Sequence, residues 1–263
     1  QEFLGVRITQ GSGVVTLDQQ HYCETIVRDF KRYIGRRNYS EVPMQANAEL
    51  YSAFSPTPEQ VDWVARFPYA TIVGKIEYLT AITRPGIAYA VSMLSRFMAQ
   101  PTYRACQAVT RLLNYLSRRS SYGLVYRGGR LDMHAYSDSD WATCPVTRRS
   151  ISGTVVFMNG APISWMSRRQ QIVATSSMEA EYIAAYYAAQ DVVWFRALLL
   201  DLDLQDPNQP TPLFIDNESA RALAHNPVHH ARSKHIDVKF HWLREQVMAG
   251  TLHVLHVDTG DQK

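Results

Sequence analysis

The sequence has 263 residues, of which 46% are hydrophobic and 19% charged, and it carries a formal net charge of +3. These values describe a soluble globular protein with one large domain or two ordinary ones, and they exclude a disordered chain. No apolar run approaches the roughly 20 residues that cross a bilayer, and the N-terminal residues lack the features of a secretion signal, so we expect no membrane association.

The cysteines are few and widely spaced, at Cys23, Cys106 and Cys144. Without a Cys-x-x-Cys pair, this spacing argues against a zinc site and against a disulfide framework. Free thiols favour a reducing environment, so we expect an intracellular location, in the cytoplasm or the nucleus.

Charge is distributed unevenly along the chain. Residues 1–129 contain 15 Lys and Arg against 9 Asp and Glu, whereas residues 130–263 contain 12 against 15. A basic segment beside an acidic one suits a protein that holds a polyanion with one part and a divalent metal with the other. Two ordinary solvated surfaces would show the same charge counts, so charge alone does not distinguish the two interpretations.

The first half begins with a predicted hairpin, formed by residues 2–8 and 13–19 around a Gly-Ser-Gly turn. An amphipathic helix is expected over residues 19–34. Residues 39–60 are rich in Pro, Ser and Ala without clear periodicity, so they predict an extended connection. Three helices should follow, at about 68–82, 86–98 and 102–118, with Pro85 in a first helical turn.

A strand over residues 123–129 closes this half and ends in Gly128 and Gly129. We place the domain boundary at this glycine pair, so that the domains are residues 1–129 and 130–263. The second domain begins with three consecutive predicted strands, at 133–138, 152–160 and 162–168.

Helices and strands then alternate. A long helix is expected from Glu179 to about Leu200, followed by a buried strand that leads into a short helix within residues 211–225. Another helix covers residues 234–250, and residues 251–257 supply a last strand. Three antiparallel strands followed by helix, strand, helix, helix and strand predict an α/β domain around a mixed sheet.

Two acidic residues lie at predicted strand ends: Asp138 ends the first strand of this domain and Asp216 ends the fourth. Open α/β sheets bind ligands beyond strand ends of this kind. Asp140 points to the same side as Asp138, because side chains on a strand repeat every second residue. Asp140 is either a supporting residue or part of the turn that follows.

The long helix offers a third acid, from Glu179 or Glu181. Two positions on a helix differ by about 200°, so both cannot face one site. Ser176 and Glu179 match a capping box, in which the glutamate reaches back to the backbone N–H of the cap. Glu181 has no such role, and the small Ala184 and Ala185 after it would let that face approach the sheet. We therefore assign Glu181 to the site.

Three convergent carboxylates would hold two Mg²⁺ ions about 3.5–4 Å apart, an arrangement that suits hydrolysis of a phosphodiester. Each acid also has a purely structural interpretation. Asp216 could cap the helix that starts near Glu218, and the Asp-Ser-Asp stretch could be a solvated turn. The combination of the three acids favours the metal site.

Several long motifs then resemble one family. The second half resembles the ribonuclease H domain of copia-type LTR retrotransposon reverse transcriptases, in the stretches AYSDSDW, RRSISGTVVFMNGAPISWMSRRQ, ATSSMEAEYIAA, DNESA and SKHIDVKFHWLRE. The first half is similar to the palm end, thumb and connection of such a polyprotein, in FLGV, PYATIVGKIEYLTAITRPGIAYAVSMLSRFMAQPT and LNYLSRRSSYGLVY. The resemblance implies a ribonuclease H-like mixed five-stranded sheet flanked by helices, preceded by a mainly helical thumb and connection region.

The resemblance also implies a function. The acids that match Asp138, Glu181 and Asp216 carry RNA cleavage within RNA/DNA hybrids in that family, with two Mg²⁺ ions for which Mn²⁺ may substitute. A fourth metal-binding aspartate is expected shortly after the last strand, where Asp258 and Asp261 are the candidates. The paired aspartates of the polymerase would lie upstream of residue 1, so we expect no DNA synthesis. The implied partners are the hybrid and the rest of the polyprotein.

Substrate contacts are expected from residues around the sheet. Arg148, Arg149, Arg168 and Arg169 flank the second and third strands and suit phosphates. His235 and Asp237 lie near the start of a helix, where they could contact substrate, or where Asp237 could serve the helix dipole. An RNA-containing duplex would be recognised by its shape and 2′-hydroxyls rather than by base sequence.

Two other functions remain open. The domain could be a catalytically inactive nucleic-acid-binding or assembly module that lacks the fourth acid. It could also be another nuclease, or a transposase-like enzyme, built on the same sheet.

Overall fold

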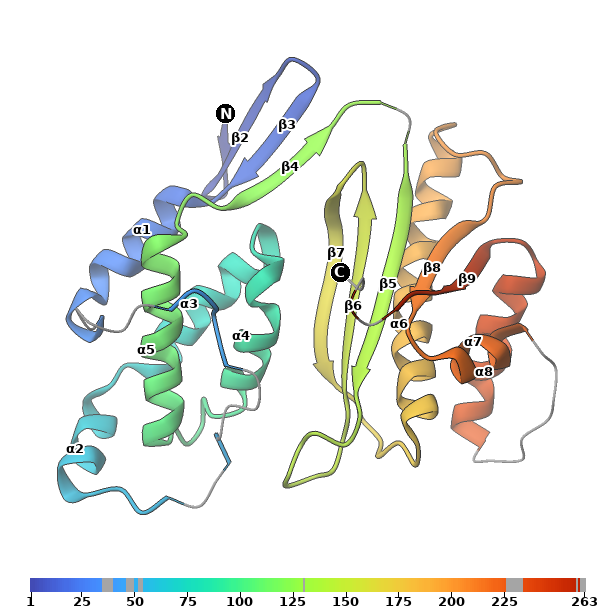
Figure 1. The fold of residues 1–263 in the computed structure, drawn as a ribbon. Helices are drawn as coiled ribbons and strands as arrows, with labels where there is room; N and C mark the ends of the chain where they lie inside the picture. The colour runs from blue at the N-terminus through green and yellow to red at the C-terminus, as the bar shows by residue number, and fades with distance from the viewer. Residues whose placement is uncertain are drawn as a thin grey trace. The chain divides into compact units, whose positions relative to one another are not determined.

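The computed structural model describes residues 1–34, 40–45, 50–51, 54–129, 131–225, 234–258 and 260, with the backbone alone at residues 234–237. The chain divides into two compact units, Gln1–Val125 and Tyr126–Lys263, which are described separately below. The division falls within the strand that precedes Gly128 and Gly129 (Figure 1).

The first unit contains a small sheet of order β1-β2-β3-β4. Its strands are β1 (Glu2–Phe3), β2 (Val6–Gly11), β3 (Val14–Asp18) and β4 (Gly123–Arg127). The predicted hairpin is present as β2 and β3, with Gly11 opposite Val14. Ser12 and Gly13 between them have φ of 52° and 73°, the positive values that a tight two-residue hairpin turn requires.

The described part of this unit also contains five helices, α1 (Gln20–Asp29), α2 (Pro58–Arg66), α3 (Tyr69–Ile82), α4 (Ala88–Ser95) and α5 (Tyr103–Arg118). Short 3-10 turns at Lys31–Tyr33 and Pro85–Ile87 follow α1 and precede α4, so both predicted helices there are shorter than expected. Fully buried aliphatic side chains of α1, α3 and α5 make the core, among them Ile26, Ile76 and Leu113.

Helix α2 corrects one prediction. Residues 39–60 were expected to be extended throughout, but Pro58 to Gln60 form the first turn of α2. The Thr57 Oγ1 accepts from the Gln60 N–H at 3.4 Å, and the Gln60 Oε1 accepts from the Thr57 N–H at 2.9 Å. This reciprocal capping box, with proline at the first helical position, outweighs the loop-like composition of the segment.

The second unit contains a five-stranded sheet of order β7-β6-β5-β8-β9 (Figure 1). Its strands are β5 (Met133–Asp140), β6 (Ile151–Met158), β7 (Ala161–Arg169), β8 (Thr211–Ile215) and β9 (Leu252–His256). The first three strands pair antiparallel, whereas β8 is parallel to both β5 and β9. This is the predicted mixed sheet.

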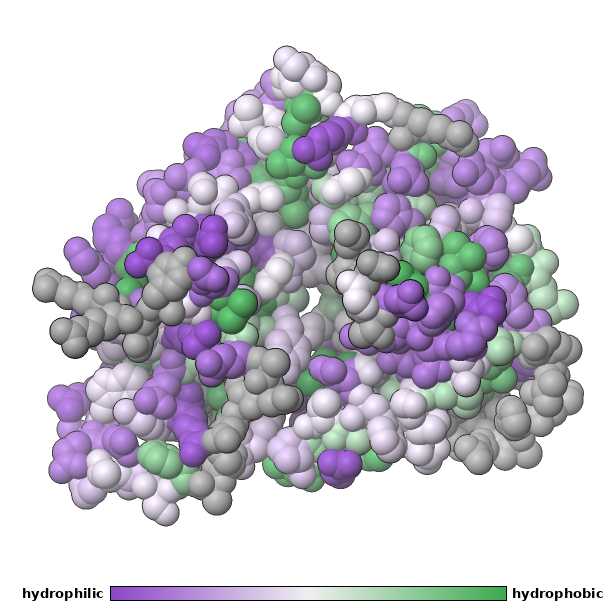
Figure 2. Space-filling view, viewed as in Figure 1, coloured by the Kyte–Doolittle hydropathy of each residue, from purple (hydrophilic) through white to green (hydrophobic). Residues whose placement is uncertain are grey.

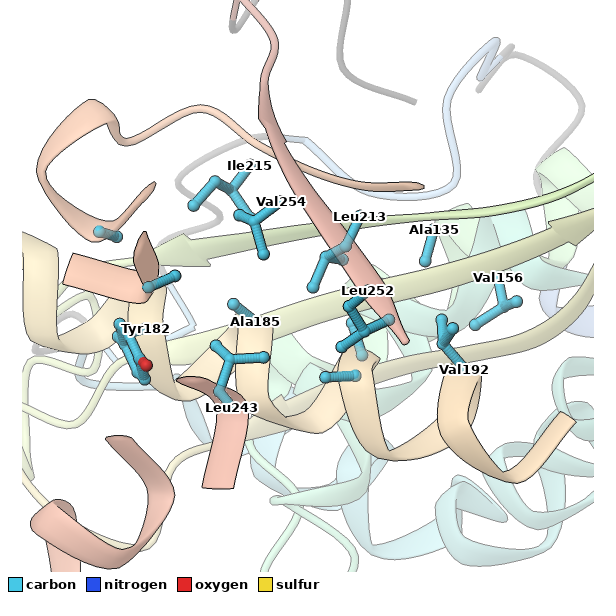
Figure 3. Close-up of a cluster of buried hydrophobic side chains, with 14 of the residues drawn as sticks. Ala135, Val156, Tyr182, Ala185, Val192, Leu213, Ile215, Leu243, Leu252 and Val254 are labelled. Atoms are coloured by element: carbon cyan, nitrogen blue, oxygen red, sulfur yellow. The ribbon is translucent and has the colours of Figure 1, made fainter. Parts of the chain in front are cut away.

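Among its described residues, the second unit also has the helices α6 (Ser177–Asp201), α7 (Glu218–His225) and α8 (Lys234–Met248). Side chains from all three helices join strand residues in one core, with Ala185, Val192 and Leu243 facing Leu213 and Val254 (Figure 3). The small side chains of Ala185, Ala188 and Ala189 on α6 are buried in this core against strand residues, so the predicted close approach of the helix to the sheet is present.

Polar residues dominate the face seen in Figure 2, where hydrophobic residues form small separate areas. Among the described residues, none of the helices combines the length and the apolar character that a membrane span requires.

Candidate active site

The register of two parallel strands places the first two acids. Ser137 on β5 pairs with Ile215 on β8, and Asp138 and Asp216 are the residues that follow this pair. Neighbouring strands lie about 4.8 Å apart, and parallel strands end at the same edge of the sheet. The two carboxylates therefore meet at the carboxyl end of β5 and β8, although they are far apart in the chain.

The start of α6 supplies the third acid. Ser176 is the N-cap, and its Oγ accepts from the Glu179 N–H at 3.2 Å. The Glu179 carboxylate serves this helix end as expected, but its partners differ from those of the predicted capping box. It accepts from the backbone N–H of Thr175 at 2.6 Å and from the Thr175 hydroxyl at 2.7 Å, rather than from the N–H of Ser176.

Asp138, Glu181 and Asp216 come together at this edge. One carboxylate oxygen of each lies within 4.8 Å of the others. The backbone N–H of Ser139 points at two of them, 2.8 Å from Asp138 Oδ1 and 2.9 Å from Glu181 Oε1. Glu181 is only 5% exposed, and its Oε2 is buried without a hydrogen-bond partner among the described residues. A buried oxygen of this kind, beside two further carboxylates, matches the hard oxygen ligands that Mg²⁺ prefers.

The surroundings of these acids raise their pKa values. Burial, followed by the negative charges of Asp138 and Asp216, raises the pKa of Glu181 to about 9. Burial and the charge of Asp216 also raise the pKa of Asp138. Like charges in a poorly solvated site favour the protonated form unless a cation compensates them. The cluster is therefore able to hold a metal ion, and in its absence it retains a proton.

The structural roles considered for Asp216 as a helix cap and for Asp138 and Asp140 as a turn are not those seen. Asn217 Oδ1 accepts from the Ala220 N–H at 2.9 Å, so Asn217 rather than Asp216 caps the start of α7. Asp138 and Asp140 both lie within β5 and not in a turn. Asp140 is exposed at the end of the strand and is not a member of the cluster, but its negative charge contributes to the raised pKa of Asp138.

The predicted arginines lie at the same edge of the sheet. Arg148 and Arg149 precede β6, and Arg169 ends β7. Arg169 pairs with Ile151, which in turn pairs with Asp140, so two strand spacings, roughly 10 Å, separate the backbones of Arg169 and Asp140. The Arg169 guanidinium contacts the sulfur of Cys144 at 3.9 Å. Arg168, next to Arg169, is exposed.

The other predicted residues lie outside the cluster or outside the described residues. Asp258 follows β9 with an 87% exposed side chain, and its Oδ1 lies 3.6 Å from His256 Nε2. It is not a member of the acidic cluster. Asp261 lies outside the described residues. His235 and Asp237 are on α8, but their side chains lie outside the described part of the chain.

Two residues of the site were missed by sequence reasoning. Ser139 supplies the shared N–H, and the buried Gln170, directly after β7, donates a hydrogen bond to the carbonyl of Ala180 beside Glu181. A backbone donor carries no sequence signal. Alternation along β5 does indicate that Ser139 points away from Asp138 into the interior, whereas no local pattern indicates a role for Gln170.

The sheet order, the helices packed against it and the carboxylates at the β5 and β8 ends are those expected of a ribonuclease H-like mixed sheet. No family model matches the chain. Among curated proteins, a Pol polyprotein from transposon RE1 of Arabidopsis thaliana is 42% identical over 195 residues, which is 74% of this chain and 13% of that protein. The Pol polyprotein from transposon TNT 1-94 of Nicotiana tabacum is 34% identical over 99% of this chain and 20% of its own length.

The chain matches a segment of copia-type retrotransposon Pol polyproteins, as its motifs predict. It spans a fifth or less of the length of these two relatives.

One solved structure shares the fold over most of the chain. The foamy viral protease-reverse transcriptase, solved in complex with dsDNA, aligns with 98% of this chain and 45% of its own chain, at 13% identity and a TM-score of 0.53. LC11-RNase H1, solved in complex with an RNA/DNA hybrid, aligns with 50% of this chain and 88% of its own, at 18% identity and a TM-score of 0.37.

Proposed function

We propose that the second unit hydrolyses the RNA strand of RNA/DNA hybrids endonucleolytically, as the ribonuclease H part of a Pol polyprotein. The observation that carries this proposal is the meeting of Asp138, Glu181 and Asp216 within 4.8 Å at one edge of the sheet. Three acids from three separate elements, one of them almost fully buried, are costly to assemble unless a cation balances them.

Asp138, Glu181 and Asp216 would hold a pair of Mg²⁺ ions, for which Mn²⁺ would substitute. Bound ions of this type supply an activated water on one side of the phosphodiester and stabilise charge on the leaving oxygen on the other. The Ser139 N–H orients the carboxylates of Asp138 and Glu181 toward one point. The core beneath Glu181 keeps water from its inner side, which strengthens the attraction between its carboxylate and a cation.

A fourth carboxylate, from Asp258 or Asp261, belongs to the same proposal. The backbone N–H of Val257 donates to the carbonyl of Ile215 at 3.0 Å, and Ile215 directly precedes Asp216. The chain that leaves β9 therefore runs beside the third acid.

Arg148, Arg149, Arg168 and Arg169 would bind phosphates of the duplex, and His235 and Asp237 on α8 would contact other parts of the substrate. Arg168 and Arg169 lie on β7, two strand spacings from β5 and Asp138, so they would contact phosphates away from the bond that is cut. Contacts of this kind position a duplex without reading its sequence, and they make binding weaken as salt rises. Specificity for a hybrid would come from the shape and the 2′-hydroxyls of the RNA strand.

The proposal places the protein with the rest of its Pol polyprotein, in the cytoplasm or the nucleus. Cys23, Cys106 and Cys144 are free and buried, which suits a reducing compartment.

The test compares cleavage of an end-labelled RNA/DNA hybrid with cleavage of double-stranded RNA, double-stranded DNA and branched DNA, each with Mg²⁺, with Mn²⁺ and with a chelator. We expect metal-dependent cleavage of the RNA in the hybrid alone. Preferred cleavage of branched DNA would instead indicate a transposase-like enzyme. Absence of cleavage by a folded protein that carries the downstream polyprotein residues would overturn the proposal.

Asp216→Asn tests whether the acidic cluster carries this cleavage. It removes one charge from the cluster without changing the size of the side chain, so turnover should fall by about 100-fold or more while hybrid binding remains. Asp191→Asn is the control. Asp191 lies on α6 outside the cluster, and its Oδ2 accepts a hydrogen bond from the Ser164 hydroxyl at 2.7 Å. Full turnover by the Asp216 variant would show that the site is elsewhere.

An inactive nucleic-acid-binding or assembly module is the second candidate function. The exposure of Asp258, outside the cluster, favours it, because three carboxylates then remain among the described residues. Metal titration in the presence of an uncleavable hybrid separates the two functions. Two bound ions support the hydrolase, and one weak ion or none supports the inactive module.

A further inference from the structure

Gln170 lies behind the acidic cluster and contacts two of the three elements that form it, β5 and α6. It directly follows β7 and is only 2% exposed. Its Nε2 lies 2.9 Å from the carbonyl oxygen of Ala180 on α6, 2.9 Å from Ser152 Oγ on β6, and 3.4 Å from Ser139 Oγ on β5. One side chain thus links α6 to two strands of the sheet.

The orientation of this amide is determined by its neighbours. The carbonyl of Ala180 can only accept, so the nitrogen of Gln170 must face it. An amide nitrogen has two hydrogens, which serve the two acceptors at 2.9 Å, and Ser139 Oγ at 3.4 Å is a weaker third contact. The Oε1 of Gln170 is then left buried without a hydrogen-bond partner among the described residues.

This arrangement is unfavourable for stability alone. A buried polar atom without a partner costs free energy that an apolar side chain of similar shape would not. The contacts of Nε2 give the amide a different role, because they reach residues next to the acidic cluster. Ala180 directly precedes Glu181, and Ser139 supplies the N–H that Asp138 and Glu181 share.

We propose that Gln170 is a positioning residue that holds the first turn of α6 against β5 and β6, so that Glu181 reaches the Ser139 N–H beside Asp138. This inference rests on the proposed metal-dependent function. Gln170 touches neither substrate nor the acids. It acts through the backbone at Ala180 and through Ser139, and it sets the separation between the carboxylates of Glu181 and Asp138.

The test uses Gln170→Met, which keeps the length and approximate volume of the side chain but removes the amide donor. Mn²⁺ binding to the full chain is measured by calorimetry, together with kcat and KM for hybrid cleavage and with the thermal unfolding midpoint. We expect Mn²⁺ affinity and kcat to fall by about 10-fold, the usual effect of losing a group that orients metal ligands. KM for the hybrid should stay unchanged, because the surface that binds the duplex is intact.

Gln19→Leu is the matched control. Gln19 is also 2% exposed and also has an unpartnered amide atom, its Nε2, but it belongs to the first unit. This variant should leave Mn²⁺ affinity unchanged. Gln170→Asn is a second variant, whose amide is one methylene too short to span Ala180 and Ser152, and it should lose metal affinity as Gln170→Met does.

The outcomes separate this inference from the proposed function. If the wild-type protein binds no metal and cleaves no hybrid, the proposed function fails and the inference fails with it. If the wild type does both and a folded Gln170 variant binds Mn²⁺ as the wild type does, only the inference is overturned. A fall in unfolding temperature without a change in Mn²⁺ affinity also overturns it, because Gln170 would then serve stability alone.

Discussion

Asp138 and Glu181 accept a hydrogen bond from one and the same donor, the backbone N–H of Ser139, at 2.8 Å and 2.9 Å. Asp138 comes from a strand and Glu181 from a helix, yet this single N–H holds their carboxylates next to each other. A single N–H cannot neutralise two carboxylates. The remaining negative charge makes the site responsive to protons and to metal ions, and this response can be measured.

Metal binding should release a proton. The pKa of Glu181 is raised to about 9, so its carboxyl is protonated at neutral pH in the metal-free protein. A carboxylate must lose its proton to bind a metal, and apparent affinity should therefore rise with pH up to about 9. Calorimetry of Mg²⁺ or Mn²⁺ binding in buffers of different ionisation enthalpy measures the protons released. Binding without proton release, or affinity that falls as pH rises, would contradict this prediction.

Glu181→Gln should stabilise the metal-free protein at alkaline pH. The folded state holds the Glu181 proton with a pKa of about 9, compared with the ordinary value of 4.5. The contribution of Glu181 to the free energy of unfolding is therefore fully present below about pH 4.5 and is lost as pH rises through about 9. A neutral glutamine avoids this loss, and we expect a gain of roughly 1–3 kcal/mol at about pH 8 and little change at about pH 4.

Urea denaturation in the presence of a chelator, at both pH values, measures this effect. Glu245→Gln serves as control, since Glu245 is exposed on α8 and should show no such gain. An equal gain in the control variant would mean that the effect is one of overall charge. No gain in the Glu181 variant would show that burial of this carboxylate is not costly.

Arg196→Met should destabilise the second unit. Arg196 is only 4% exposed, and its guanidinium donates to the carbonyls of Pro207 at 2.7 Å and Gln209 at 2.5 Å, and to Thr211 Oγ1 at 3.4 Å. The variant removes the donor that these acceptors between α6 and β8 share, at a cost of roughly 2–4 kcal/mol. Chemical denaturation measures the loss.

Arg244→Met is the comparison for this prediction. The Arg244 Nε donates to the carbonyl of Phe240 within its own helix at 3.3 Å, so its removal should cost less than about 1 kcal/mol. Equal losses in the two variants would show that the connection to β8 does not depend on Arg196.

Gly123→Ala should destabilise the first unit. A Cβ at Gly123, the first residue of β4, would lie 2.4 Å from the carbonyl oxygen of Leu17 and 2.9 Å from the Cβ of Asp18. Backbone atoms must move to relieve such contacts, at a cost of roughly 1–3 kcal/mol. Gly74→Ala in the exposed middle of α3 meets nothing within 4 Å and should instead gain up to about 1 kcal/mol. Thermal unfolding of both variants tests the pair, and a loss in both would show that close approach at β4 is not the cause.

Local patterns predicted much of this protein from its residues alone. The antiparallel strands, the long helix and the final strand of the second unit follow from apolar periodicity and from glycine and proline positions. The choice of Glu181 over Glu179 followed from helix rotation and from the cap at Ser176, which are properties of a few neighbouring residues. The capping box at Thr57 was equally local, but the composition of the surrounding segment concealed it.

Only the tertiary structure decided how the acids meet and what surrounds them. The pairing of Ser137 with Ile215 brings Asp138 next to Asp216, and strand pairing between distant segments has no local signature. The raised pKa of Glu181 depends on burial by the whole core and on charges from two other elements. The contacts of Gln170 likewise join three elements. These features depend on desolvation and long-range packing, which no short stretch of sequence contains.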